Sequence, residues 1–138
     1  MRDGGFASFL LESFALMGSE APGAYAELCG RLARRRVRLI VDGDDLTLEF
    51  TRRGVAAVAG GPPSIEVRAT QRSILDLVDA RRTLVESVLA DEIELRGAPE
   101  DLLVFHEGLM AYVHGAVRAP SVADLLRSYR SHRPGDCR

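Results

Sequence analysis

The chain has 138 residues, which is enough for one hydrophobic core and too few for two, so a single domain is expected. Its 46% hydrophobic and 28% charged residues and its formal net charge of -2 are ordinary for a globular protein, and the missing basic surplus argues against a nucleic-acid partner. No apolar run approaches the ~20 residues of a transmembrane helix. Cys29 and Cys137 belong to no paired motif, so a reducing cytoplasm is the expected location.

Two amphipathic helices are predicted at the N-terminal end of the chain. Across residues 6–17 the apolar side chains recur three and four positions apart, with serines and a glutamate between them, which is typical of a helix with one apolar face. After the interruption GSEAPG, a second helix with the same spacing is predicted from Pro22 to the arginines that follow Leu32. The apolar face of each helix must cover another part of the chain.

Strands are predicted next, because the hydrophobic period changes to two. Residues 36–42 and 46–51 alternate between apolar and polar side chains on either side of the sequence DGDD, which predicts a hairpin. Short glycine-containing turns then set off residues 55–59 and 64–69 as two further strands. We expect these four strands to pair in sequence order as an antiparallel meander with one apolar face.

The second half of the chain returns mainly to helical spacing. Helices are predicted over residues 70–80, where Thr70 can act as a cap, and over residues 83–89, where Thr83 and Glu86 have the spacing of a capping box. After them the pattern predicts a strand over residues 92–96, a long helix over 99–115 that stops at Gly115, a helix over 121–130 and a disordered polar tail over 131–138.

This order of elements predicts the fold class α+β. We expect a sheet of about five strands, mostly antiparallel, covered on one face by helices, with extra helices at the N- and C-terminal ends. Residues 1–130 should form one domain whose core spans residues 36–115.

The segment Ile93–Gly115 carries two of the chain's three histidines, which raises the question of a metal site. His106 and His114 lie eight positions apart on one predicted helix and are therefore separated by roughly 12 Å, whereas ligands of one zinc ion stand on the order of 3 to 4 Å apart. The sequence HEGLMAYVH also lacks the H-E-x-x-H spacing of zinc proteases. We expect no metal site and no cofactor.

Acid-base catalysis by His106 would require a partner that Glu107, Tyr112 or Asp42 could supply in three dimensions. No nucleophile elbow, cysteine–histidine pair or phosphate-binding loop accompanies this histidine. No catalytic residue is assigned.

Gly108 lies inside the same predicted helix, where glycine costs roughly 1 kcal/mol relative to alanine. A glycine there leaves space beside the helix. The space admits either a neighbouring helix or a ligand between helix and sheet.

The pattern over residues 36–115 resembles the sterol carrier protein domains. The features that carry the resemblance are VRLIVDGDDLTLEFTRRGVAAVAGG, then SIEVRATQRSILDLVDAR, then LADEIELRGAPEDLLVFHEGLMAYVHG. In that family a strand like SIEVRAT leads into a helix like SILDLVDA, and a later G-x-l-x-v-x-G-d strand leads into a final amphipathic helix. The chain departs from the pattern at Ala90–Glu92, where a glycine is usual, and at Ala98, where an aspartate is usual. The terminal helices lie outside the core pattern.

The resemblance implies a cavity between sheet and helices that holds an apolar small molecule, such as a lipid, a sterol, a fatty acyl chain or a polyketide-like compound, without altering it chemically. Such domains are frequent as stand-alone bacterial proteins. The residues expected to bind the ligand are Leu48, Phe50, Leu77, Val78, Val88, Leu89, Phe105, Gly108, Leu109, Tyr112 and Val113.

Two other classes of function stay open at this point. The same cavity could host a small isomerase or cyclase with His106 or Asp42 as base. Alternatively, the chain could be an interaction module, with the stripe formed by Phe6, Phe9 and Phe14 as a homodimer seam at the N-terminal helix.

Overall fold

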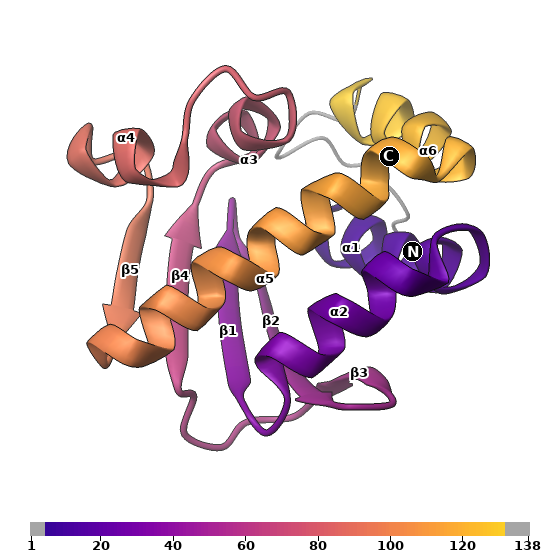
Figure 1. Cartoon of the computed structure of the whole chain (residues 1–138). Coiled ribbons are helices and arrows are strands. Elements are labelled where there is room, and N and C mark those ends of the chain that lie inside the picture. The colour runs from indigo at the N-terminus through magenta and orange to yellow at the C-terminus, as the bar shows by residue number, and fades with distance from the viewer. Residues whose placement is uncertain (1–4, 132–138) are drawn as a thin grey trace.

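The computed structural model describes residues 5–131, which fold as six helices on a five-stranded sheet. The predicted class α+β is therefore confirmed. The C-terminal tail that was expected to be disordered lies outside the described residues, apart from Ser131. In chain order the elements are α1 (Phe6–Glu20), α2 (Pro22–Leu32), β1 (Arg36–Val41), β2 (Asp44–Thr51), β3 (Gly54–Val58), β4 (Ile65–Ala69), α3 (Gln71–Val78), α4 (Leu84–Leu89), β5 (Glu94–Gly97), α5 (Pro99–Arg118) and α6 (Pro120–Ser131) (Figure 1).

The strand order in the sheet is β3-β2-β1-β4-β5. β1 and β2 form the predicted hairpin, and the turn residues Asp42 and Gly43 both have positive φ, which matches the right-handed twist of the strands. β2 pairs with β3 and β4 pairs with β5, both in antiparallel fashion, so the sheet is mostly antiparallel as expected.

The expected four-stranded meander is wrong at its last step, because β4 pairs with β1 and runs parallel to it. The connection from β3 passes through Gly60 and Gly61, both with positive φ, and then through Pro62 and Pro63, which have no backbone N–H to donate to a hairpin partner. The chain therefore crosses to the far side of β1 before the next strand begins. Period-two spacing shows which side chains share a face and does not show which strand is the neighbour.

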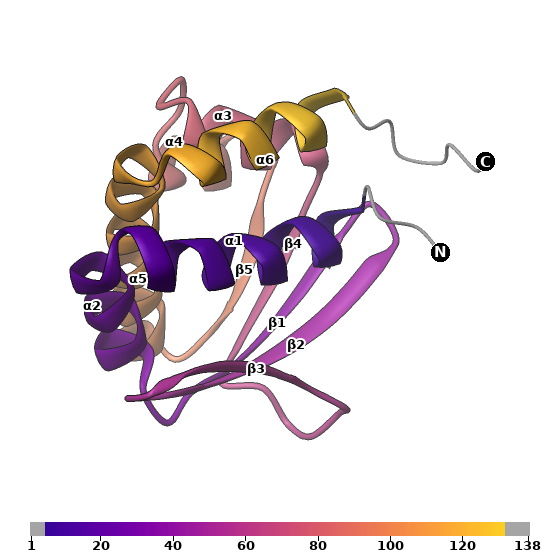
Figure 2. The ribbon, with the colours of Figure 1, turned by 90° about the vertical axis from the view of Figure 1, so that its right-hand side faces the viewer.

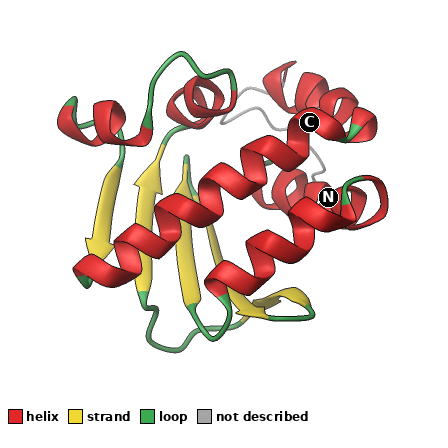
Figure 3. Ribbon diagram, in the orientation of Figure 1, coloured by secondary structure: helices red, strands yellow, loops and turns green. Residues whose placement is uncertain are grey.

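One face of the sheet is apolar and the other is charged. Leu39 of β1 stands in register with Leu46 of β2 and Val67 of β4, which places an apolar row across the inner face. On the outer face, Arg38 contacts Asp45 at 2.6 Å. Helices lie over the inner face only, with α5 and α2 in front of the strands in Figure 3 and all helices on one side of the sheet in Figure 2.

α2 and α5 are the most closely packed pair of helices. Gly115, predicted to end the long helix, lies inside α5, which continues to Arg118. A Cβ at this glycine would meet Met17 Sδ at 2.7 Å and Ala24 Cβ at 2.8 Å. Gly115 is therefore a point of close helix packing and not a helix stop.

α1 fills the space between the helix pair and the sheet. Phe6, Phe9 and Phe14 are each 6% exposed or less, so the stripe considered as a dimer seam packs inside its own chain. The C-terminal helix α6 lies against α1, where Tyr129 stacks on Phe9 with ring centroids 4.6 Å apart. Among residues 5–131 no helix combines the length and the apolar character needed to cross a bilayer.

Candidate ligand-binding cavity

An apolar cavity of about 100 Å³ lies between the inner face of the sheet and the helices that cover it. The sheet lines it with Leu39 of β1, Leu48 and Phe50 of β2 and Val67 of β4. These side chains share one face because residues two apart in a strand point the same way. The floor of the cavity is therefore set by the period-two pattern of the strands.

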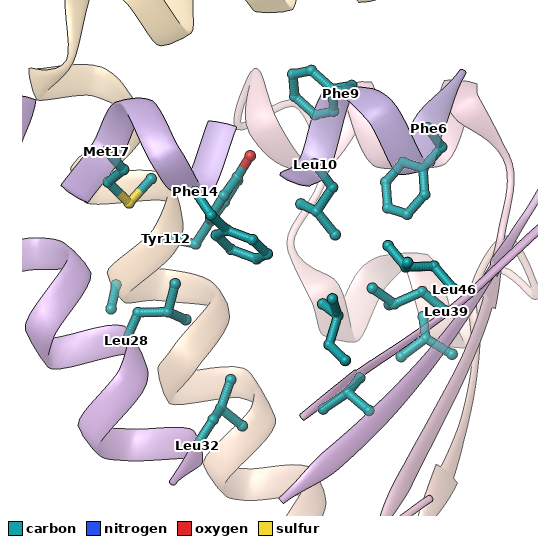
Figure 4. Close-up of a cluster of buried hydrophobic side chains, with 14 of the residues drawn as sticks. Phe6, Phe9, Leu10, Phe14, Met17, Leu28, Leu32, Leu39, Leu46 and Tyr112 are labelled. Atoms are coloured by element: carbon teal, nitrogen blue, oxygen red, sulfur yellow. The ribbon is translucent and has the colours of Figure 1, made fainter. Parts of the chain in front are cut away.

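α1 and α2 form one wall of the cavity. Leu10 and Phe14 of α1 and Leu32 of α2 are turned toward the space above Leu39 (Figure 4). The ring of Phe14 meets the ring of Phe50 edge-on, with centroids 6.3 Å apart. The residues of α1 are absent from the predicted ligand-binding set, although their regular apolar spacing predicts that this face covers another part of the chain.

α3, α4 and α5 form the opposite wall, where the cavity lies nearest to solvent. Ile74 and Leu77 of α3 and Phe105 and Leu109 of α5 line it and are only half-buried, whereas the sheet residues are buried. Leu84 of α4 closes the same side and is itself buried. The most exposed side of the lining is therefore between α3–α4 and α5, and this side is called the mouth below.

α3 is held to α6 by polar contacts at both of its ends. At the first, Gln71 Nε2 donates a hydrogen bond to the Tyr129 carbonyl oxygen at 2.7 Å. At the second, Arg130 donates to both carboxylate oxygens of Asp79, at 2.7 and 2.9 Å. The Arg130 guanidinium thereby lowers the pKa of Asp79 below its ordinary value. α3, which borders the mouth, is thus held to α6 by a bidentate ion pair.

The only polar side-chain atom that the lining residues bring to the wall is the hydroxyl of Tyr112. It lies 2.7 Å from Ser13 Oγ, and Ser13 in turn donates to the Leu10 carbonyl oxygen at 2.7 Å. Because the single Ser13 hydroxyl proton is used in that bond, Tyr112 is the donor to Ser13. Burial raises the pKa of Tyr112 to about 12, so this side chain is neutral at physiological pH.

Most of the residues expected to bind a ligand lie on this lining. The structure brings together Leu48, Phe50, Leu77, Val78, Phe105, Gly108, Leu109 and Tyr112. Val88 and Val113 are half-buried and pack on the core outside the lining. Leu89 is 79% exposed and faces away from the cavity. On a helix as short as α4, hydrophobic spacing did not determine which side faces inward.

Gly108 lies on the lining, and the side on which it lacks a Cβ is occupied by α2. A Cβ there would meet Leu32 Cδ1 at 2.7 Å and Leu28 Cδ1 at 3.6 Å. Of the two alternatives for this glycine, the structure therefore shows the neighbouring helix.

The histidine and carboxylate candidates for acid-base catalysis lie outside the lining, whereas Tyr112 lies on it. His106 is half-buried and His114 is exposed. Asp42 accepts a hydrogen bond from the Gln71 backbone N–H at 2.5 Å, and Glu107 pairs with Arg31 at 3.1 Å. Both carboxylates thus have structural partners. Among residues 5–131 no group of histidine, cysteine and carboxylate side chains is placed to hold a metal ion.

No protein-family model and no curated protein sequence matches the chain. Among solved structures, the UbiJ-SCP2 ubiquinone synthesis protein matches 75% of this chain and 87% of its own, at 20% identity and a TM-score of 0.57. Sterol carrier protein 2 from Yarrowia lipolytica, in its apo form, matches 81% of this chain and 95% of its own, at 10% identity and a TM-score of 0.56. The sterol carrier protein domain 2 of Helicoverpa armigera matches 79% of this chain and 87% of its own, at 12% identity and a TM-score of 0.54. The chain therefore has the fold of the sterol carrier protein domains.

Proposed function

We propose that this chain is a non-catalytic carrier that holds an apolar small molecule in the cavity beneath α1, α3 and α5. The observation that supports this most directly is the composition of the lining, whose side chains are all hydrocarbon except for the hydroxyl of Tyr112. That hydroxyl is already hydrogen-bonded to Ser13. Such a wall favours a hydrocarbon occupant, because a buried polar group without a hydrogen-bond partner costs several kcal/mol. A lipid, a sterol, a fatty acyl chain or a polyketide-like compound is the proposed class of ligand.

The size of the cavity adds a requirement to this proposal. Pockets for small molecules commonly measure ~300–1,000 Å³, whereas this cavity has about 100 Å³. A whole lipid or sterol therefore needs additional space. The elements best suited to provide it are α3 and α4, which pack less closely on the remaining elements than α2 and α5 do. Their movement would widen the side where the lining is half-buried.

The lining also favours binding over catalysis. An isomerase or cyclase needs a general acid or base within reach of its substrate, and the histidines and carboxylates named as candidates lie outside the lining. A bacterial, cytoplasmic location for the carrier remains part of the proposal and rests on the family resemblance and on two cysteines that belong to no paired sequence motif. Cell fractionation tests it.

The proposal is tested by filling the cavity from its floor. Val67 is 3% exposed and lines the cavity, so Val67→Phe should occupy the ligand's space. We expect several-fold weaker uptake of a fluorescent fatty acid. The matched control is Val113→Phe, which enlarges a half-buried valine outside the lining. Equal uptake by both variants and the wild type would overturn the proposed site.

Native mass spectrometry of the protein purified from its producing cells then identifies the ligand. We expect a co-purified apolar compound that dissociates intact. Conversion of that compound to a product by the purified protein would contradict the non-catalytic part of the proposal.

A further inference from the structure

α5 carries an exposed apolar stripe on the face opposite the cavity. Leu103, Met110 and Val117 are 60%, 41% and 80% exposed, and they follow one another at intervals of seven residues. Side chains seven positions apart on a helix lie almost in line, so the three form one row ~21 Å long. Phe105 and Tyr112 point from the other side of the helix into the cavity. In Figure 1 α5 crosses in front of the sheet with this outer side open.

A pair of opposite charges flanks the stripe. Glu100 precedes Leu103 by three positions and Arg118 follows Val117 by one. The eighteen positions between the two charges equal ~5 full helical turns, so both side chains leave the helix on the same side of the stripe. Both residues are exposed, and within residues 5–131 neither takes part in an ion pair.

We propose that a second copy of this chain binds the stripe, with the two α5 helices antiparallel about a twofold axis at Met110. In this arrangement Met110 meets the partner's Met110, and Leu103 meets the partner's Val117. Glu100 then lies ~3 Å along the helix axis from the partner's Arg118, on the same side of the contact. The twofold axis makes the same ion pair twice.

The pattern of charge favours a second copy in this orientation. A parallel pairing would leave Glu100 and the partner's Arg118 ~27 Å apart along the helix axis, too far for an ion pair, with the two helix dipoles aligned in the same direction. The antiparallel pairing forms the ion pair twice and sets the two helix dipoles in opposite directions. Because the stripe and the cavity occupy opposite faces of α5, the dimer leaves the cavity free and does not depend on the proposed function.

The first experiment places a charge on the twofold axis. Sedimentation velocity of the full chain, from micromolar to several hundred micromolar, should show a monomer–dimer equilibrium. Met110→Glu brings two like charges together and should weaken association by about tenfold or more. The control is Leu89→Glu on α4, which removes an exposed apolar residue elsewhere and should associate like the wild type.

The second experiment tests the orientation. Glu100→Arg and Arg118→Glu each create two repulsive pairs in the antiparallel dimer, so each variant alone should associate several-fold more weakly. An equimolar mixture of the two should recover dimer, since every cross-pair then joins an Arg to a Glu.

Three outcomes would overturn the proposal. The first is a wild-type chain that stays monomeric throughout the concentration range. The second is association that Met110→Glu leaves unchanged or that Leu89→Glu removes equally. The third is a mixture of the two charge variants that dimerises no better than either variant alone.

Discussion

The hydroxyl oxygen of Tyr112 lies 2.7 Å from Ser13 Oγ, although 99 positions separate the two residues in the sequence. Ser13 is fully buried and Tyr112 is 7% exposed. Their hydrogen bond joins α5 to α1 beside the cavity, and the hydroxyl of Tyr112 points toward α1 (Figure 4). The wall of the cavity consequently presents the carbon atoms of the tyrosine ring.

Tyr112→Phe removes this hydroxyl and should lower the free energy of unfolding by about 1 kcal/mol, the net contribution of an ordinary hydrogen bond. Uptake of a fluorescent fatty acid should stay at the wild-type level, because the hydroxyl is already bonded within the protein. Urea denaturation and ligand titration measure the two effects. A several-fold loss of uptake would show that the hydroxyl contacts the ligand.

Alkaline pH provides a second test of the same side chain. Tyr112 ionises at a pKa of about 12 in the folded chain and at its ordinary value of 10 when exposed. The unfolded chain therefore loses this proton first, and the stability that neutral Tyr112 contributes should fall as the pH rises from about 10 toward 12. Stability curves of the wild type and of Tyr112→Phe should converge and then cross over that interval, because the shift in pKa is worth more than the about 1 kcal/mol of the hydrogen bond. Curves that stay parallel would contradict the pKa shift.

The ion pair between Arg130 and Asp79 should control exchange of the ligand, because it fastens the helix that borders the mouth. Arg130→Gln should speed the release of a bound fluorescent fatty acid, measured by stopped-flow displacement. Arg127→Gln is the matched control, since the ion pair of Arg127 is with Asp124 within α6 and not with α3. If both variants release the ligand at the same rate, the ion pair does not control ligand exchange.

Low pH should weaken the same ion pair between Arg130 and Asp79. The pKa of Asp79 is lowered in the folded chain, so its stabilisation is present above the ordinary aspartate pKa and is lost as the pH falls through the lowered value. Acid denaturation should accordingly begin at higher pH in Arg130→Gln than in Arg127→Gln.

Gly115→Ala should destabilise the chain although alanine is the better helix former. The added methyl group would meet Met17 Sδ and Ala24 Cβ at less than 3 Å, and overpacking of this kind costs about 1–3 kcal/mol. Gly30→Ala on α2 is the control, because no atom lies within 4 Å of its added Cβ. This control should gain up to about 1 kcal/mol from helix propensity alone. Thermal unfolding measures both, and a stabilised Gly115→Ala would mean that α2 and α5 are not tightly packed there.

Local spacing along the chain was sufficient to identify the elements and their caps. Thr70 caps α3 and Thr83 forms a capping box with Glu86, as predicted. Leu48 and Phe50 point to the inner face of the sheet because period-two alternation depends only on strand geometry. Each of these features is set by residues within a few positions of one another.

Contacts between segments distant in the sequence could be identified only from the tertiary structure. The parallel pairing of β4 with β1 depends on the path through Gly60–Pro63, and the role of Gly115 depends on Met17 and Ala24 from other helices. The inward side of α4 was likewise undetermined, so Leu89 was expected in the cavity and lies in solvent. By itself the sequence determined which residues share a face, because helical and strand periods are local. The tertiary structure decided which faces meet, because that choice depends on how side chains far apart in the sequence fit together.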